Sequence, residues 1–181
     1  MVAKAGRTEN QLLPMRVHIR WMLRRDMNEI LRIEQDSFEL PWTEEDFLNC
    51  LRSRNCIGMS AEQGERVVAF MIYELHKRKL DILNFAVQPD FRRARVGAQM
   101  VSKLISKLSG HRRTHITAVV RETNLQAQLF FRAVNFTALR VLRDHFDDTG
   151  ESAYLMRYRL PMSEWARENL EEEEAGEPAD E

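Results

Sequence analysis

The part of the sequence best suited to bind a ligand is the basic loop 92–98. It reads RRARVGA and combines three guanidinium groups with small side chains. Guanidinium groups bind phosphates through paired hydrogen bonds, and a glycine such as Gly97 lets the backbone approach a bound group closely. A helix is predicted to begin at Val96, and the first N–H groups of a helix lack partners and carry a partial positive charge. Together these features predict a site for a pyrophosphate.

The elements around this loop are a buried strand before it and an amphipathic helix after it. Residues 82–87 are apolar except for Asn84, which is typical of a strand covered on both faces. Pro89 and Asp90 end that strand. After the loop, apolar residues recur at positions 101, 104, 105 and 108, the spacing of one helical face, and Gly110 is suited to end the helix.

The rest of the chain predicts a mixed α/β domain without internal repeats. Asp26 is the expected N-cap of the first helix, and Thr43 with Asp46 has the spacing of a capping box. Asn124 is expected to cap the last helix, and residues 144–151 are expected to form a loop. In chain order, the predicted elements are strand 17–22, helix 24–38, a helix from Thr43, strands 56–61 and 66–75, a strand from Leu80, a helix from Val96, strand 114–120, a helix after Asn124, and strands 136–142 and 153–159.

Length and charge indicate one domain with two terminal segments. We expect a flexible segment at 1–15, the folded domain at 16–160, and a short helix capped by Ser163 with an acidic tail within 161–181. The formal net charge is −1, yet residues 164–181 contain nine acidic residues and one arginine. The first 163 residues therefore carry a charge of about +7, which suits an anionic ligand or a negatively charged assembly.

The sequence shows no signal peptide and no apolar run long enough to cross a membrane, so a cytoplasmic protein is expected. Cys50 and Cys56 form no CxxC motif and lie near no histidine cluster. They are predicted to be core or half-buried thiols, with no disulfide framework and no metal site. Sequence-specific binding of nucleic acid is not expected.

Several stretches, in this order and spacing, resemble the GNAT superfamily of acetyl-CoA-dependent N-acyltransferases. The resemblance covers residues 17–158. Within the superfamily, the chain is similar to the bacterial enzymes that acetylate the N-termini of ribosomal proteins, as the pair Pro41-Trp42 before an acidic helix start indicates. The stretches are Ile33-Glu34 through Phe38-Glu39-Leu40-Pro41-Trp42, strand 83–89, loop 92–98, block 124–136 and segment 151–156.

The resemblance implies a mixed, mostly antiparallel sheet of six or seven strands flanked by helices. The strands starting at Leu80 and Thr114 would be parallel and would separate into a V-shaped cleft. Acetyl-CoA would be the co-substrate, with its pantetheine along the first of these strands and its pyrophosphate on the loop. By this resemblance the coenzyme-binding residues are Phe85, Ala86, Val87, Arg92, Arg93, Ala94, Arg95, Val96, Gly97, Ala98, Asn124 and Phe131.

The chain departs from the family pattern at three positions. Arg95 stands where the loop usually has a glycine, and its side chain either neutralises a phosphate of the coenzyme or narrows the site. Val119 stands where the ribosomal group has a glutamate base, and Phe131 where it has a tyrosine acid. Neither valine nor phenylalanine can transfer a proton, yet the attacking amine must lose one.

Three other residues are candidates for this proton transfer, and two of them have a simpler alternative. Asp81 starts the central strand, where some relatives place a residue that orders a water, but it could only be a charge that protects a strand edge. Glu39 precedes Pro41-Trp42. His145 lies in the loop that usually covers the substrate, but it could only be an exposed loop residue. Trp42 is expected to be a packing residue, and Glu122 and Glu151 to be solvated.

The function favoured by the sequence is acetyl transfer from acetyl-CoA to an α-amine, with a protein N-terminus as the acceptor and a ribosomal protein as a candidate substrate. Two alternatives stay open: a catalytically impaired acyl-CoA-binding or regulatory protein with the same fold, and an acetyltransferase for a small amine.

Overall fold

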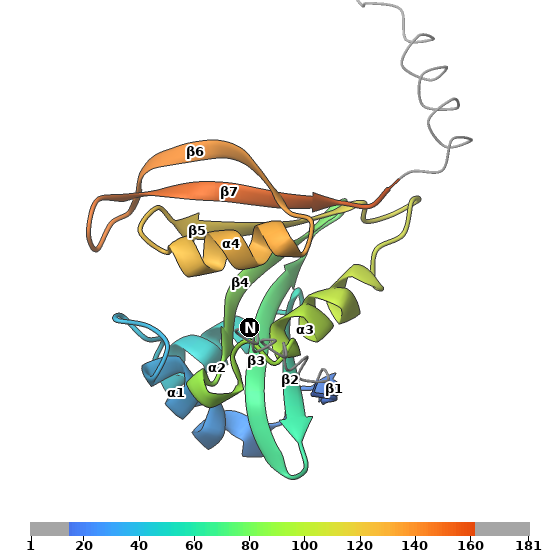
Figure 1. Ribbon diagram of the computed structural model, residues 1–181, viewed down its shortest axis with the longest axis vertical. Coiled ribbons are helices and arrows are strands. Elements are labelled where there is room, and N and C mark those ends of the chain that lie inside the picture. Colours follow the sequence, from blue (N-terminus) through green and yellow to red (C-terminus); the bar gives the residue numbers. More distant parts are fainter. Residues whose placement is uncertain (1–14, 162–181) are drawn as a thin grey trace, which may run out of the picture.

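The protein is built around one seven-stranded sheet with the strand order β1-β2-β3-β4-β5-β7-β6, shown in the computed structural model in Figure 1, which describes residues 15–161. Only β4 and β5 are parallel; all other neighbours are antiparallel. This confirms the predicted fold class. The strands are β1 (His18–Trp21), β2 (Cys56–Gln63), β3 (Arg66–Leu75), β4 (Lys79–Val87), β5 (His115–Arg121), β6 (Thr137–Phe146) and β7 (Glu151–Arg159).

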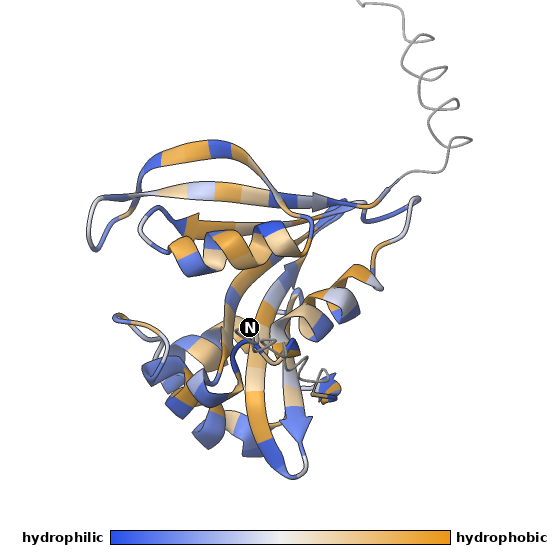
Figure 2. Cartoon of the chain, in the orientation of Figure 1, coloured by the Kyte–Doolittle hydropathy of each residue, from blue (hydrophilic) through white to orange (hydrophobic). Residues whose placement is uncertain are grey.

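Helices cover both faces of the sheet. On one face, α1 (Met27–Gln35) and α2 (Glu44–Arg52) enclose a core that includes Phe47 and Phe70. On the other, α3 (Val96–Ile105) and α4 (Leu125–Ala133) enclose a larger core that includes Met100 and Phe131. Strand β3 contributes to both cores because its side chains alternate between the faces. Figure 2 shows its hydrophobic colouring beside the hydrophilic outer surfaces of α1 and α2.

Strands β4 and β5 pair over only part of their length. The parallel register joins Lys79–Ile82 to His115–Ala118 and then stops. At this point a register shift between β3 and β4 leaves Leu83 opposite no residue of β3. Beyond it, β4 continues beside β3 while β5 continues beside β7. This produces the predicted V, which we call the β4–β5 separation.

Two of the predicted helices differ from the structure in their bounds, and the predicted start of a third is confirmed. The first helical segment is divided into a 3-10 turn, η1 (Arg24–Asp26), and α1, so the predicted range of 24–38 is too long. The α3 helix ends at Ile105 instead of near Gly110. The capping box is confirmed: the N–H of Asp46 donates to the Thr43 hydroxyl, and the N–H of Thr43 donates to the Asp46 carboxylate.

Asp26 does not cap α1 with its side chain as predicted. Its carboxylate is buried and accepts hydrogen bonds from the N–H of Leu23 at 2.8 Å and from the hydroxyl of Ser60 at 3.1 Å. The guanidinium of Arg20 adds two bonds, at 2.6 and 2.8 Å, and also pairs with Glu62. Asp26 therefore connects η1 to β1 through Arg20 and to β2 through Ser60.

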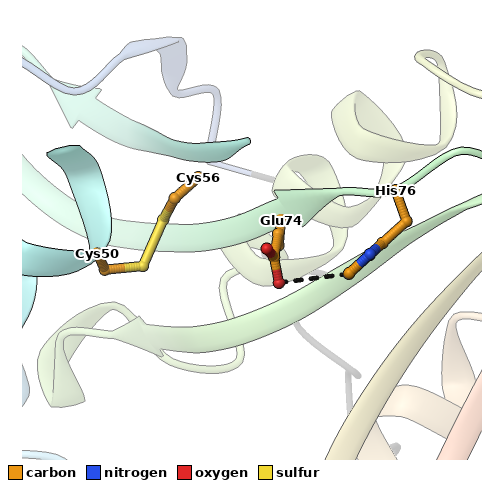
Figure 3. The surroundings of a disulfide bond; sticks show 4 residues. All are labelled: Cys50, Cys56, Glu74 and His76. Atoms are coloured by element: carbon orange, nitrogen blue, oxygen red, sulfur yellow. Dashed lines mark ion pairs between the residues drawn. A yellow bond between two sulfur atoms is a disulfide. The ribbon is translucent and has the colours of Figure 1, made fainter. Parts of the chain in front are cut away.

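The two cysteines form a disulfide between the end of α2 and the start of β2, shown in Figure 3 beside the ion pair of Glu74 and His76. The prediction of free thiols is wrong, although the predicted burial is correct: Cys56 is buried and Cys50 is half-buried. Their Cα atoms lie 6.0 Å apart, a separation that a disulfide spans. The packing of α2 on β2 brings them together.

The predicted terminal segments, including the helix capped by Ser163 and the acidic tail, lie outside the described residues. Within residues 15–161, none of the helices is long and apolar enough to span a membrane.

Candidate active site

Loop 92–98 connects β4 to α3 and is fixed by Arg92. A short 3-10 turn, η2 (Pro89–Phe91), follows β4. The guanidinium of Arg92 then donates to the carbonyl of Val87 at 3.0 Å and to the hydroxyl of Ser37 at 3.0 Å. Arg92 thus anchors the loop to the end of β4 and to the segment between α1 and α2.

The backbone of this loop offers N–H groups at the start of α3. Arg95 is the N-cap, and the first bond of the helical pattern runs from the N–H of Gln99 to the carbonyl of Arg95. The N–H groups of Val96, Gly97 and Ala98 precede that bond, so they can donate to an anion. Arg93 and Arg95 have left-handed backbones, with φ of 65° and 63°, and both side chains are exposed.

Gly97 lies in a tightly packed position inside the protein. A Cβ atom at this position would lie 3.1 Å from Cε2 of Phe130 and 3.3 Å from Cζ of Phe85. The rings of Phe85 and Phe130 lie 5.7 Å apart and bring β4, α3 and α4 together. The sequence suggests a close approach to a ligand here, and the structure shows a close approach to two aromatic rings. Ala94 beside it is half-buried and packs against the same core.

The edge of β4 next to loop 92–98 is open. Phe85, Ala86 and Val87 pair with β3 on one side, and β5 is no longer beside them on the other. Their backbone groups on that side can therefore bond to an extended ligand, as an unpaired strand edge does. An open strand edge that leads into a set of helix N–H groups suits a ligand with an amide-containing arm and a pyrophosphate.

On the other side of the β4–β5 separation, the polar candidate is Asn124. Its side-chain oxygen accepts from the N–H of Ala127 at 3.0 Å, which confirms the predicted helix cap. Phe131, in the same helix, is buried, and its ring lies 5.3 Å from that of Phe130 and 4.9 Å from that of Phe136. The ring of Phe131 is thus part of the core below α4.

Asp81 lies in the parallel-paired part of β4, just before the strands separate. Its carboxylate pairs with Lys79 at 2.6 Å and His76 at 2.9 Å and accepts a hydrogen bond from Thr117. Asp81 and Thr117 are register partners, and Val119 follows two residues later, so all three lie on one face of the sheet. Val119 is 39% exposed.

Glu39 and His145 lie elsewhere. Glu39 is exposed in the segment between α1 and α2. His145 is exposed on β6, which extends to Phe146, so the prediction that it lies in a loop is wrong. Its ring lies 5.1 Å from that of Phe146. Within the described residues, no hydrogen bond or ion pair joins Asp81, Glu39 and His145 to one another, so the structure does not bring them together as a cluster.

The tip of the β6–β7 hairpin is held by Arg121, which the sequence does not indicate. Its guanidinium donates to Glu151 at 3.0 Å and to Asp148 at 2.6 Å and lies 3.7 Å from the centre of the Phe146 ring. Glu151 is not simply solvated as expected. It also accepts from the N–H and hydroxyl of Thr123, and these bonds, with Arg121, lower the pKa of Glu151.

The segment between α1 and α2 is attached through Trp42. Its indole ring packs against Phe47 at 5.3 Å, as expected of a packing residue. The backbone N–H of Trp42, not its indole N–H, donates to the buried carboxylate of Glu34 at 2.8 Å. Glu34 also accepts from the side-chain amide of Asn84 at 3.0 Å, so the segment is tied to β4 next to the β4–β5 separation.

A cavity of about 640 Å³ lies at the opposite end of β4. It is formed by the β3–β4 turn and the α3–β5 connection, and His76, Arg78, His111 and Arg113 are among its lining residues. The parallel-paired part of β4 and β5 separates it from the open strand edge. It is therefore not part of the candidate site.

Residues 24–136 match the family model described as acetyltransferase (GNAT) family. The chain is 26% identical over 140 residues to the [ribosomal protein bS18]-alanine N-acetyltransferase of Escherichia coli strain K12, which covers 76% of this chain and 93% of that protein. A putative enzyme of the same name from Bacillus subtilis strain 168 is 21% identical over 139 residues, 76% of this chain and 92% of that one.

Two solved structures show the same fold. The crystal structure of the Escherichia coli ribosomal-protein-S18-alanine N-acetyltransferase has a TM-score of 0.72 at 23% identity, covering 82% of this chain and 96% of that one. Arabidopsis thaliana NAA60 in complex with acetyl-CoA has a TM-score of 0.68 at 16% identity, covering 80% and 98%. With more than half of its length matched by the family model, the chain belongs to the acetyltransferase (GNAT) family and is an N-acetyltransferase.

Replacing Arg95 with glycine should change stability and coenzyme binding in opposite directions. A left-handed arginine costs about 1 kcal/mol relative to glycine, so the variant should unfold at higher urea concentration. Removing an exposed guanidinium beside the helix N–H groups should weaken acetyl-CoA binding about tenfold. Calorimetric titration of acetyl-CoA measures the second effect. Asn135→Gly, at an exposed left-handed position outside loop 92–98, is the control and should leave coenzyme binding unchanged. Tighter binding by Arg95→Gly would show instead that the arginine crowds the site.

Proposed function

We propose that this chain transfers an acetyl group from acetyl-CoA to the α-amino group of a protein N-terminus, with a ribosomal protein as the substrate. The observation that carries the coenzyme half of this proposal is the open edge of β4 at residues 85–87, which leads to the N–H groups of residues 96–98. The acceptor half is supported by the curated relatives, whose names specify the alanine N-terminus of ribosomal protein bS18. A cytoplasmic location accompanies this proposal, because ribosomal proteins are made there.

The residues of this chain fit an acyl thioester of this kind. Backbone groups of Phe85, Ala86 and Val87 can bond to the amides of a pantetheine arm, and the first N–H groups of α3 can bind its pyrophosphate. Exposed Arg93 and Arg95 can neutralise phosphate charge. A backbone N–H at the open edge can also stabilise the oxyanion that forms when the thioester is attacked.

The proposed reaction is direct attack of the amine on the thioester carbonyl. The N–C bond forms, the C–S bond breaks, and the coenzyme leaves as a thiolate that takes a proton from solvent. An α-amino group has a pKa near 8, so a sizeable neutral fraction exists near neutral pH without a strong base. Because Val119 and buried Phe131 cannot transfer protons, the proton lost by the amine passes to water. Asp81, on the same face as Val119, is the proposed carboxylate that orders this water.

The test is a thiol-release assay with acetyl-CoA and peptides that carry free N-termini, including the N-terminal sequence of a ribosomal protein. Turnover is expected on the free peptides and not on the same peptides with a blocked N-terminus. Acetylation of small amines alone would overturn the proposed acceptor. Coenzyme binding without thiol release on any acceptor would overturn the proposed reaction.

A further inference from the structure

The carboxyl group of Glu34 is buried where the segment between α1 and α2 meets β4. This segment carries Glu39, a candidate for proton transfer from the acceptor amine, so we take it as the acceptor side of the proposed site. The side chain of Glu34 is at the end of α1, and the residue is 1% exposed. One oxygen, Oε1, accepts from the N–H of Trp42 at 2.8 Å and from Nδ2 of Asn84 at 3.0 Å. Asn84 is 7% exposed and follows Leu83, the residue without a partner on β3. A single carboxyl oxygen therefore joins the α1–α2 segment to β4.

The remaining oxygen of each side chain is buried without a partner. Oε2 of Glu34 and Oδ1 of Asn84 make no hydrogen bond within the described residues. A carboxylate oxygen and an amide oxygen are both acceptors, so neither satisfies the other while Glu34 is ionised. Buried polar atoms without partners are rare in folded proteins, and a pair of them next to an existing hydrogen bond requires an explanation.

We propose that Glu34 is a neutral carboxylic acid whose Oε2–H donates to Oδ1 of Asn84, which closes a two-bond acid–amide ring. The first bond of the ring, from Nδ2 of Asn84 to Oε1 of Glu34, is present. One added proton satisfies both of the unpartnered oxygens. The hydrogen bond from Trp42 to Oε1 is compatible with this ring, because a carboxyl oxygen accepts more than one bond.

The surroundings of Glu34 favour the neutral form. Burial raises the pKa of Glu34 above its ordinary value of 4.5, and the hydrogen bonds from Trp42 and Asn84 oppose the increase only in part. Of the charged groups on neighbouring segments, Arg92 is bonded to Val87 and Ser37, and Glu39 is exposed. Both donors to Glu34, the backbone N–H of Trp42 and the amide of Asn84, are neutral, and within residues 15–161 Glu34 forms no ion pair.

The ring makes Glu34 a positioning residue, a role that rests on the proposed function. The α1–α2 segment carries Glu39, Pro41 and Trp42, and β4 carries the open edge for the coenzyme. Because Glu34 bonds to both, the acid–amide ring fixes the distance between the acceptor side and the thioester. Loss of the proton would leave both oxygens buried without a partner and loosen that connection.

The protonation state can be tested without any assay of activity. Carbon-13 NMR of the glutamate side-chain carboxyls in the full-length protein, titrated with pH, should show one signal that stays protonated after those of exposed glutamates have ionised. Glu34→Gln assigns that signal by removing it. Titration of Glu34 together with the exposed glutamates would overturn the proposal and would point to an ionised Glu34 bridged to Asn84 by water.

The positioning role is tested by two matched variants. In the parent protein, the acceptor KM should rise at high pH as Glu34 loses its proton. Glu34→Gln keeps the shape of the side chain and supplies an N–H in place of the acid O–H. Its acceptor KM should therefore stay within about twofold of the parent value and should not rise at high pH. Asn84→Asp places two carboxyls together and should raise the acceptor KM about tenfold with little change in coenzyme affinity. A large fall in kcat for Glu34→Gln would overturn the proposal, because it would require an ionisable group.

These outcomes are separable from those of the proposed function. If no peptide is acetylated, the NMR titration of the parent protein and of Glu34→Gln still decides the protonation state. If Asn84→Asp does not fold, the pH dependence of the acceptor KM in the parent protein and in Glu34→Gln decides the role. An equal rise of the acceptor KM with pH in the parent protein and in Glu34→Gln would overturn the positioning role.

Discussion

Replacing Val119 with glutamate is expected to raise kcat on an N-terminal peptide by about tenfold to a hundredfold. Val119 is 39% exposed on β5 beside the β4–β5 separation, on the same face as Asp81, so a carboxylate there would stand where the resemblance places a base. General base catalysis contributes about a hundredfold or more when the base is well positioned. The expected gain is smaller because the introduced side chain lacks partners selected to orient it.

The measurement is kcat from thiol release as a function of pH. The gain should be largest below the pKa of the α-amine, near 8, where most of the substrate carries a proton, and should vanish above it. Val119→Gln is the matched control, because glutamine has nearly the same size as the introduced glutamate and cannot take a proton. Equal rates for the two variants at every pH would mean that proton transfer from the amine does not limit the reaction.

Replacing Asp26 with asparagine is expected to lower the free energy of unfolding by about 3 kcal/mol. Asp26 is 3% exposed and accepts bonds from Arg20, Leu23 and Ser60. Asparagine has a single acceptor oxygen and would turn an N–H group toward the guanidinium of Arg20. Urea unfolding measures the loss, and Glu62→Gln, which removes the more exposed carboxylate around Arg20, is the control with the smaller effect. A loss below about 1 kcal/mol for Asp26→Asn would contradict the expectation.

The same variant should change how stability depends on pH. Burial alone would raise the pKa of Asp26, but the hydrogen bonds from Arg20, Leu23 and Ser60 outweigh it and hold the pKa below 3.8. The folded state thus binds the proton less readily than the unfolded state, and the stabilisation present at neutral pH is lost as pH falls through the folded pKa. In Asp26→Asn, this part of the acid-induced loss should be absent.

The order of elements and the strand, loop and helix around residues 92–98 could be predicted because their signals are local. The capping box at Thr43 and the cap at Asn124 are set by residues three positions apart, and the structure confirms both. The apolar run before loop 92–98 indicates a strand, and the structure confirms it, but the prediction that both faces are buried is wrong because Leu83 is 42% exposed. The resemblance supplies its separation from β5, and the structure shows that this begins after Ile82.

The contacts that hold the site together could not be predicted because their partners are far apart in the chain. Asn84 lies 50 residues from Glu34, and Glu62 lies 42 residues from Arg20. Spacing rules describe neighbours on one helix or strand and do not reach such pairs. Gly97 shows the same limit, since the rings packed closely against it come from β4 and α4.

The bond between Cys50 and Cys56 determines how far this fold depends on oxidation. The two cysteines are only six positions apart. Closing so short a ring removes little conformational entropy from the unfolded chain, so the disulfide contributes only about 2 kcal/mol to the free energy of unfolding. Cys56 is also held by its packing in the core with Phe47 and Phe70, which does not require the bond. The α2–β2 junction can therefore keep its position with the sulfurs reduced, and the same fold is available to the dithiol in a reducing compartment.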